Sequence, residues 1–165
     1  MRGWLVDTNI VSELRRPKPD QTVQVWADAQ PRTSLYLSIV TLMEVRFGAE
    51  IAGLAKKAQL EVWIEHKLRP WYAGRIVDTD ENVWLEWRRL QERGRKRGHV
   101  FGQPDLFIAA QALVHTLCVV SRDTTHYVAA SVPVFNPWTL ELIPPGKAAR
   151  QLKSGSLAEV LAVVK

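Results

Sequence analysis

The sequence predicts an α/β fold in which helices cover both faces of a mostly parallel central sheet of about five strands. Short runs of large apolar residues alternate along the chain with longer segments of helical periodicity, which is typical of parallel sheets with helical crossovers. The chain has 165 residues, enough for one stable core. Its single cysteine excludes an internal disulfide and fits a reducing compartment.

The apolar runs mark the five expected strands. These strands are Leu5–Val6, Leu35–Leu37, Ile76–Val77, Leu117–Val120 and Val134–Phe135. Each run is short and rich in Leu, Ile or Val, as buried strands of parallel sheets are. We expect the last of them to be the last strand of the sheet.

Helical patterns fill the segments between the strands. Helices are expected at residues 10–15, 21–29, from Thr41 to about Leu54, along 60–71, through 80–97 and from Pro104 onward. Asp80 is the expected N-cap of its helix, and Pro104 lies where the first helical turn tolerates proline. The helix after Pro104 is apolar nearly all round, so it should be deeply buried.

Four acidic side chains follow the strands, at the edge where parallel sheets bind their ligands. They are, in chain order, Asp7, Glu44, Asp105 and Asp123. Two carboxylates about 5 Å apart repel by roughly 3 kcal/mol at an effective dielectric of 20. Four of them would stay together only by taking up protons or by binding a hard cation, and all-oxygen ligation favours Mg²⁺ or Mn²⁺ over zinc.

Each of these acids also has an ordinary structural interpretation. Thr41 and Glu44 match a capping box. Asp105 could favour the dipole at a helix N-terminus, and Asp7 and Asp123 could stabilise turns. We favour a shared cation site because a helix cap stabilises the fold by less free energy than the repulsion among four converging carboxylates would cost. The four histidines are scattered along the chain, and none pairs at metal-ligand spacing.

Four segments resemble the PIN-domain family in order and spacing: VDTNIVSEL, LSIVTLMEVRFGAE, PDLFIAAQALVHTLCVVSRDTTHY and VFNPW. Within that family the chain is most similar to the ribonuclease toxins of VapBC-type toxin–antitoxin modules, in the FitB-like group. The resemblance covers about residues 3–138 and implies a three-layer PIN-like fold. We therefore divide the chain into a PIN-like nuclease domain at 1–138 and a C-terminal extension at 139–165, where an apolar run after Ser156 predicts a short last helix.

The resemblance implies a toxin that acts as an endoribonuclease, hydrolysing RNA phosphodiester bonds with Mg²⁺ or Mn²⁺. The family's catalytic and metal-binding acids fall on Asp7, Glu44, Asp105 and Asp123, with Asn9 and Ser121 as polar support. The resemblance also implies a cognate antitoxin, a homodimer, and contact with promoter DNA only through the antitoxin. Two alternatives stay open: a catalytically weak binding module that acts as a co-repressor with its antitoxin, and a DNA-directed nuclease of similar fold.

The charge balance permits a polyanionic partner such as RNA without establishing one. The chain has 22 Lys and Arg against 17 Asp and Glu, a net charge of +5. One basic cluster just before the helix of Asp105 could hold an RNA backbone: Arg88, Arg89, Arg93, Arg95, Lys96 and Arg97. The alternative is a solvated helix end whose cations complement the helix dipole. No apolar run is as long as a membrane span and the first residues lack signal-peptide features, so we expect a cytoplasmic protein.

The chain contains seven tryptophans, many for its length. Proteins that bind single-stranded RNA stack bases on aromatic side chains. Trp63, Trp71 and Trp87 fall within helical patterns, however, and Trp4 within a strand. We therefore expect packing in the core or in an interface to account for most of them.

Overall fold

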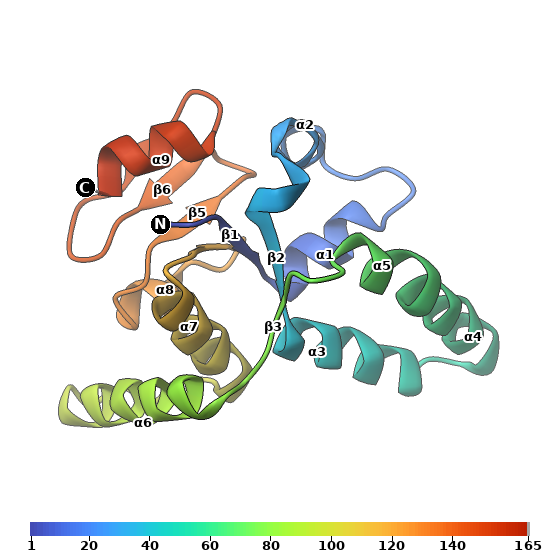
Figure 1. Ribbon diagram of the computed structural model, residues 1–165, viewed down its shortest axis with the longest axis horizontal. Coiled ribbons are helices and arrows are strands. Elements are labelled where there is room, and N and C mark those ends of the chain that lie inside the picture. The colour runs from blue at the N-terminus through green and yellow to red at the C-terminus, as the bar shows by residue number, and fades with distance from the viewer. Residues whose placement is uncertain (165) are drawn as a thin grey trace.

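The computed structural model describes residues 1–164, which form one seven-stranded sheet with helices on both faces (Figure 1). The strand order is β3-β2-β1-β4-β5-β6-β7. Strands β1 to β5 are parallel to one another, and β6 and β7 join antiparallel. The strands are β1 Trp4–Val6, β2 Leu35–Ser38, β3 Ile76–Val77, β4 Cys118–Val120, β5 Val134–Asn136, β6 Glu141–Ile143 and β7 Arg150–Gln151.

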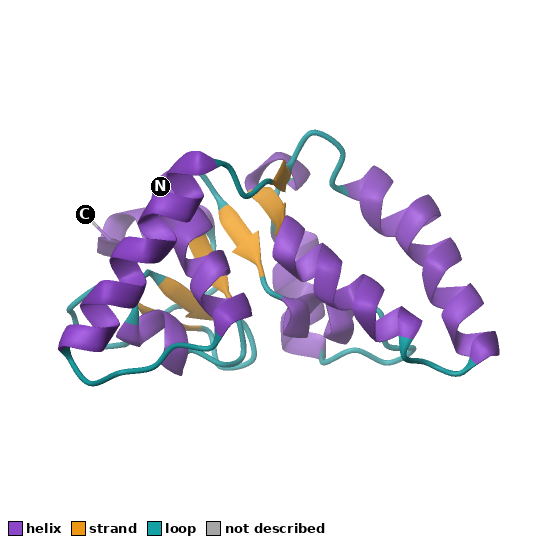
Figure 2. Cartoon of the chain, turned by 90° about the horizontal axis from the view of Figure 1, so that it is seen from below, coloured by secondary structure: helices purple, strands orange, loops and turns teal. Residues whose placement is uncertain are grey.

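The helices cover the sheet in two layers, so that the strands lie between them (Figure 2). They are α1 Thr8–Leu14, α2 Gln21–Ala29, α3 Ile39–Glu50, α4 Leu54–Trp63, α5 Arg69–Trp71, α6 Glu81–Lys96, α7 Gln103–His115, α8 Thr125–Ala129 and α9 Leu157–Val164, with a π-helical turn at Ile64–Leu68 and a 3₁₀ turn at Arg32–Ser34. Among the described residues, no helix combines the length and the apolar character needed to cross a membrane.

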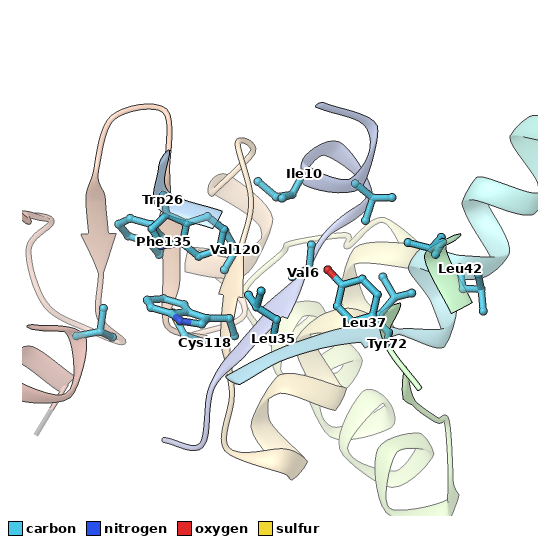
Figure 3. Close-up of a cluster of buried hydrophobic side chains, with 14 of the residues drawn as sticks. Val6, Ile10, Trp26, Leu35, Leu37, Leu42, Tyr72, Cys118, Val120 and Phe135 are labelled. Atoms are coloured by element: carbon cyan, nitrogen blue, oxygen red, sulfur yellow. The ribbon is translucent and has the colours of Figure 1, made fainter. Parts of the chain in front are cut away.

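The side chains of β1 alternate between two cores, one on each face of the sheet. Trp4 and Val6 join the core that α1, α2, α4 and α9 cover, whereas Leu5 joins the core under α6, α7 and α8. In the first core the rings of Trp26 and Phe135 lie side by side, with centroids 5.7 Å apart (Figure 3). Because β1 is buried on both faces and paired on both edges, whatever follows it lies at the centre of the molecule.

The tryptophans are only partly explained by core packing. Trp4 and Trp26 are fully buried, as expected. Trp71 and Trp84, on α5 and α6, stay 43% and 50% exposed. Trp84 lies edge-on to Trp87 and Phe107 in an aromatic group on the surface of α6 and α7.

The five predicted strands are confirmed to within a residue, but the prediction for the helix after β2 is wrong in two respects. Ser38, not Thr41, caps α3, because its hydroxyl accepts from the Val40 amide at 2.9 Å. Thr41 is buried in the first turn of α3 and donates to the Val6 carbonyl oxygen at 3.2 Å. The helix expected from Thr41 to about Leu54 is α3, which begins at Ile39 and already ends at Glu50. α4 begins at Leu54, before the next expected helix at residues 60–71, and Gly53 between the two disfavours a continuous helix.

The sheet does not end at β5, which corrects the expectation of a last strand there. β6 pairs with β5, and β7 pairs with β6. The predicted last helix is confirmed as α9, and its Val160 is fully buried in the first core. At the start of α9 the Trp26 indole N–H donates to the Gly155 carbonyl oxygen at 3.0 Å. The extension therefore packs on the same core as the rest of the chain, while the division at residue 138 stays a prediction.

Two glycines of the extension give a matched test of this packing. Gly146 and Gly155 both have φ of +65°. A Cβ at Gly155 would overlap the Phe135 ring, whereas a Cβ at Gly146 would have no atom within 4 Å among the described residues other than its two chain neighbours. Gly146→Ala should cost only the left-handed backbone penalty, about 1–2 kcal/mol. Gly155→Ala should cost about 1–3 kcal/mol more because it overpacks the core.

The measurement is urea unfolding of both variants beside the wild type. A larger loss of unfolding free energy for Gly155→Ala is expected. Equal losses in the two variants would contradict the docking of the extension against Phe135.

Candidate functional site

Asp7 lies at the carboxyl end of β1 and is 5% exposed. Its Oδ1 accepts from the Thr8 amide at 2.6 Å, which caps α1. Its Oδ2 accepts from Asn9 Nδ2 at 2.9 Å and from the Ser121 hydroxyl at 2.6 Å. Three donors thus orient the carboxylate, but none is charged, and no basic side chain within residues 1–164 forms an ion pair with it. Asp7 is therefore a buried carboxylate whose negative charge is not neutralised by a neighbour.

Asn9 and Ser121 connect Asp7 to the loop that follows β4. Asn9 Nδ2 also donates to Ser121 Oγ at 2.8 Å, and Asn9 Oδ1 accepts from the Arg122 amide at 3.1 Å. Ser121 Oγ accepts from the Asp123 amide at 3.1 Å. The structure places both residues where the sequence predicted polar support.

Glu44 approaches Asp7 through a residue that the sequence analysis gave no role. Glu44 lies on α3, and its Oε2 accepts a hydrogen bond from the Thr8 hydroxyl. The Thr8 amide donates to Asp7 at the same time. Thr8 therefore connects two of the predicted carboxylates. Its place between Asp7 and Asn9 in the opening motif was the only signal in the sequence.

Asp105 and Asp123 meet around His126, a residue to which the sequence pattern gave no role. His126 Nε2 lies 3.9 Å from Asp105 Oδ2 and 3.8 Å from Asp123 Oδ2. Asp105 is in the first turn of α7, and His126 is on α8, which packs against α7. The Asp123 side chain is 62% exposed, so it lies at the rim of the site.

The electrostatics of the site reflect burial and crowding of carboxylates. Burial raises the pKa of Asp7 to about 6; the Ser121 and Thr8 hydrogen bonds oppose the shift, and the charges of Asp105 and Glu44 add to it. Burial also raises the pKa of Asp105, an effect that His126 opposes. The negative charges of Glu44 and Asp105 therefore repel that of Asp7, and a bound cation would reduce this repulsion.

The donor set suits a hard divalent cation. Asp7, Glu44 and Asp105 offer carboxylate oxygens, which Mg²⁺ and Mn²⁺ prefer. The unneutralised burial of Asp7 is the observation that such an ion would explain. Within residues 1–164, no three His, Cys, Asp or Glu side chains are already gathered tightly enough to hold one ion. Binding would therefore require the side chains to adjust.

The basic cluster of α6 lies partly away from these carboxylates. Arg89 and Arg93 pair with Glu86, and Arg95 and Lys96 pair with Glu92. The other two members are Arg88, whose guanidinium donates to Gln91, and Arg97, the C-cap of α6. Arg93 lines a hollow with Leu113 and Val114 near the C-terminal end of α7, whereas Asp105 is in its first turn. An RNA contact by this cluster stays a prediction.

Known proteins share this architecture. Residues 4–131 match the family described as PIN domain. The chain is 38% identical over 135 residues to Toxin FitB of Neisseria gonorrhoeae, covering 81% of this chain and 97% of that protein. It is 36% identical over 135 residues to VapC ribonuclease Y4jK of Sinorhizobium fredii, covering 81% and 96%. The crystal structure of FitAcB from N. gonorrhoeae matches with a TM-score of 0.77 at 38% identity, covering 82% and 98%.

The chain shares a mostly parallel sheet flanked by helices with the matching toxin structure. The fold therefore places the two proteins in the same class of α/β proteins. The chain belongs to the PIN-domain family.

The raised pKa of Asp7 predicts how stability depends on pH in the metal-free protein. The folded state holds the Asp7 proton more tightly than the unfolded state, so stability is greatest below the unfolded pKa. It falls as pH rises through about 6. The difference between an ordinary pKa of 3.8 and about 6 corresponds to about 3 kcal/mol.

Urea unfolding in EDTA between about pH 4 and about pH 8 measures this effect. The wild type should lose stability across that range, and Asp7→Asn should lose less. Parallel pH profiles for the two proteins would show that Asp7 does not titrate with a raised pKa.

Proposed function

We propose that this chain is a metal-dependent endoribonuclease and the toxin of a VapBC- or FitAB-type module. The observation that carries the proposal is the buried, unneutralised Asp7 carboxylate with Glu44 and Asp105 beside it. Membership of the PIN-domain family and a relative named as a ribonuclease support it. RNA is the proposed substrate, because a relative of this chain is named a ribonuclease.

Mg²⁺ or Mn²⁺ is the proposed cofactor, held by Asp7, Glu44 and Asp105, with Asp123 at the rim. Such an ion would supply an activated water and stabilise the charge that develops on the phosphate. The chain's own residues fix the orientation of Asp7 in advance, through the hydrogen bonds from Thr8, Asn9 and Ser121. Preorganisation of this kind lowers the cost of reaching the reactive geometry.

His126 has a proposed role at the open side of the site. Its imidazole lies between Asp105 and Asp123, and its side chain is 37% exposed. A polyanionic RNA backbone must approach past these two carboxylates. A positively charged imidazole between them would offset part of the repulsion that the RNA would meet.

A cognate antitoxin is the proposed partner and inhibitor. The support is the similarity to FitAcB and to Toxin FitB. An apolar groove on the α1, α4 and α5 side offers a partner a surface to bury, lined by Leu14, Trp63 and Trp71 among others. Homodimerisation, contact with promoter DNA through the antitoxin, and a cytoplasmic location remain expectations from the resemblance.

RNA cleavage by the purified, antitoxin-free protein tests the proposed activity. Total RNA and single-stranded DNA are incubated with the protein in Mg²⁺, in Mn²⁺ and in EDTA. Discrete RNA fragments are expected only with metal. Asp105→Asn should lower the cleavage rate by roughly 100-fold or more, since it removes a charged group that acts at the reacting centre.

Asp28→Asn is the matched control, because it makes the same chemical change on the exposed surface of α2. It should cleave like the wild type. A folded wild-type protein that cuts no RNA with either metal would refute the proposed enzymatic activity and favour the co-repressor alternative. Metal-dependent cleavage of DNA but not of RNA would identify DNA as the substrate.

A further inference from the structure

Tyr127 places a buried hydroxyl at the acidic site that the proposed reaction does not use. The residue is on α8, is 1% exposed, and belongs to the core under α6 and α7. Its hydroxyl lies against the carboxylates of Asp7 and Asp105. Within residues 1–164 that hydroxyl nevertheless has no hydrogen bond of good geometry. A buried polar group without a partner is costly and calls for an explanation.

The chemistry of its neighbours limits what this hydroxyl can do. Ionised carboxylates only accept hydrogen bonds, so toward Asp7 and Asp105 the hydroxyl can only donate. A tyrosine hydroxyl carries its proton at neutral pH, so Tyr127 is a neutral donor beside the two carboxylates.

Asp105 depends on this donor more than Asp7 does. Asp7 already accepts from Thr8, Asn9 and Ser121. Asp105 accepts no hydrogen bond within 3.5 Å from the other described residues, and its nearest basic atom is His126 Nε2 at 3.9 Å. Carboxylates that bind metals are normally oriented by an outer hydrogen bond, and loss of that bond typically weakens metal affinity or activity 10–100-fold. Tyr127 is in position to supply that bond to Asp105.

We propose that Tyr127 is a positioning residue of the metal site, whose hydroxyl orients Asp105, and secondarily Asp7, for binding a divalent cation. The inference rests on the proposed function, because it assigns a residue to the same site. A positioning role and a purely structural role predict different results. Without metal the hydroxyl has no hydrogen-bond partner and contributes no stability, so its removal should leave the stability of the fold unchanged. Its removal should still weaken metal binding.

Tyr127→Phe tests the inference, because it removes only the hydroxyl and keeps the ring in the core. Tyr72→Phe is the matched control: Tyr72 is also buried, at 6% exposed, but lies in the core on the other face of the sheet. Binding of Mn²⁺ alone is measured by electron paramagnetic resonance, and of Mg²⁺ alone by calorimetry. The melting temperature in EDTA is recorded for all three proteins.

Tyr127→Phe should bind either metal roughly 10-fold more weakly than the wild type, with an equal or higher melting temperature in EDTA. Tyr72→Phe should keep wild-type affinity. Equal affinities for Tyr127→Phe and the wild type would overturn the inference and leave the proposed function standing. Weaker metal binding together with a lower melting temperature in EDTA would assign the hydroxyl a structural role and overturn the inference. A wild type that binds neither metal would overturn both the inference and the proposed function.

Discussion

Burial of the Asp7 carboxylate at the end of the central strand is the constraint on which the site depends. β1 is paired on both edges and covered on both faces, so the residue after it cannot reach bulk water. Desolvation makes the charged form of Asp7 costly, and the hydrogen bonds from Thr8, Asn9 and Ser121 offset only part of that cost. A cation bound at Asp7, as proposed above, would offset the rest of that cost.

The parallel topology brings the other groups to this point. The carboxyl ends of β1, β2 and β4 lie at one edge of the sheet, and the segments that follow them carry Asp7, Glu44 and Asp123. Asp105 arrives differently, in the first turn of the buried helix α7. Hydrogen bonds and close approaches through Thr8 and His126 then connect these carboxylates across segments that are far apart in the sequence.

The sequence predicted the strands and the acidic edge because both depend on local pattern and a general rule of topology. A buried apolar run followed by an acid, such as Asp7, is visible without a structure. The positions of His126 and Tyr127 beside the acids were not, because they depend on how α8 packs against α7. The capping-box alternative for Thr41 and Glu44 is wrong because Ser38, at the end of β2, is the cap, and the sequence does not locate the end of that strand to one residue. β6 and β7 were missed because neither is a run of buried apolar residues: β6 is fully buried only at Leu142, and β7 consists of the exposed Arg150 and Gln151.

Asp7, Glu44 and Asp105 are proposed to hold a divalent ion. The most direct measurement is anomalous diffraction from crystals of the antitoxin-free protein soaked in Mn²⁺, beside crystals of Asp7→Asn treated identically. We expect an anomalous peak in contact with Asp7 and Asp105 in the wild type, and no such peak in the variant. Wild-type crystals at saturating Mn²⁺ with no peak at Asp7 would contradict it, and the charge of Asp7 would then have to be relieved by a proton.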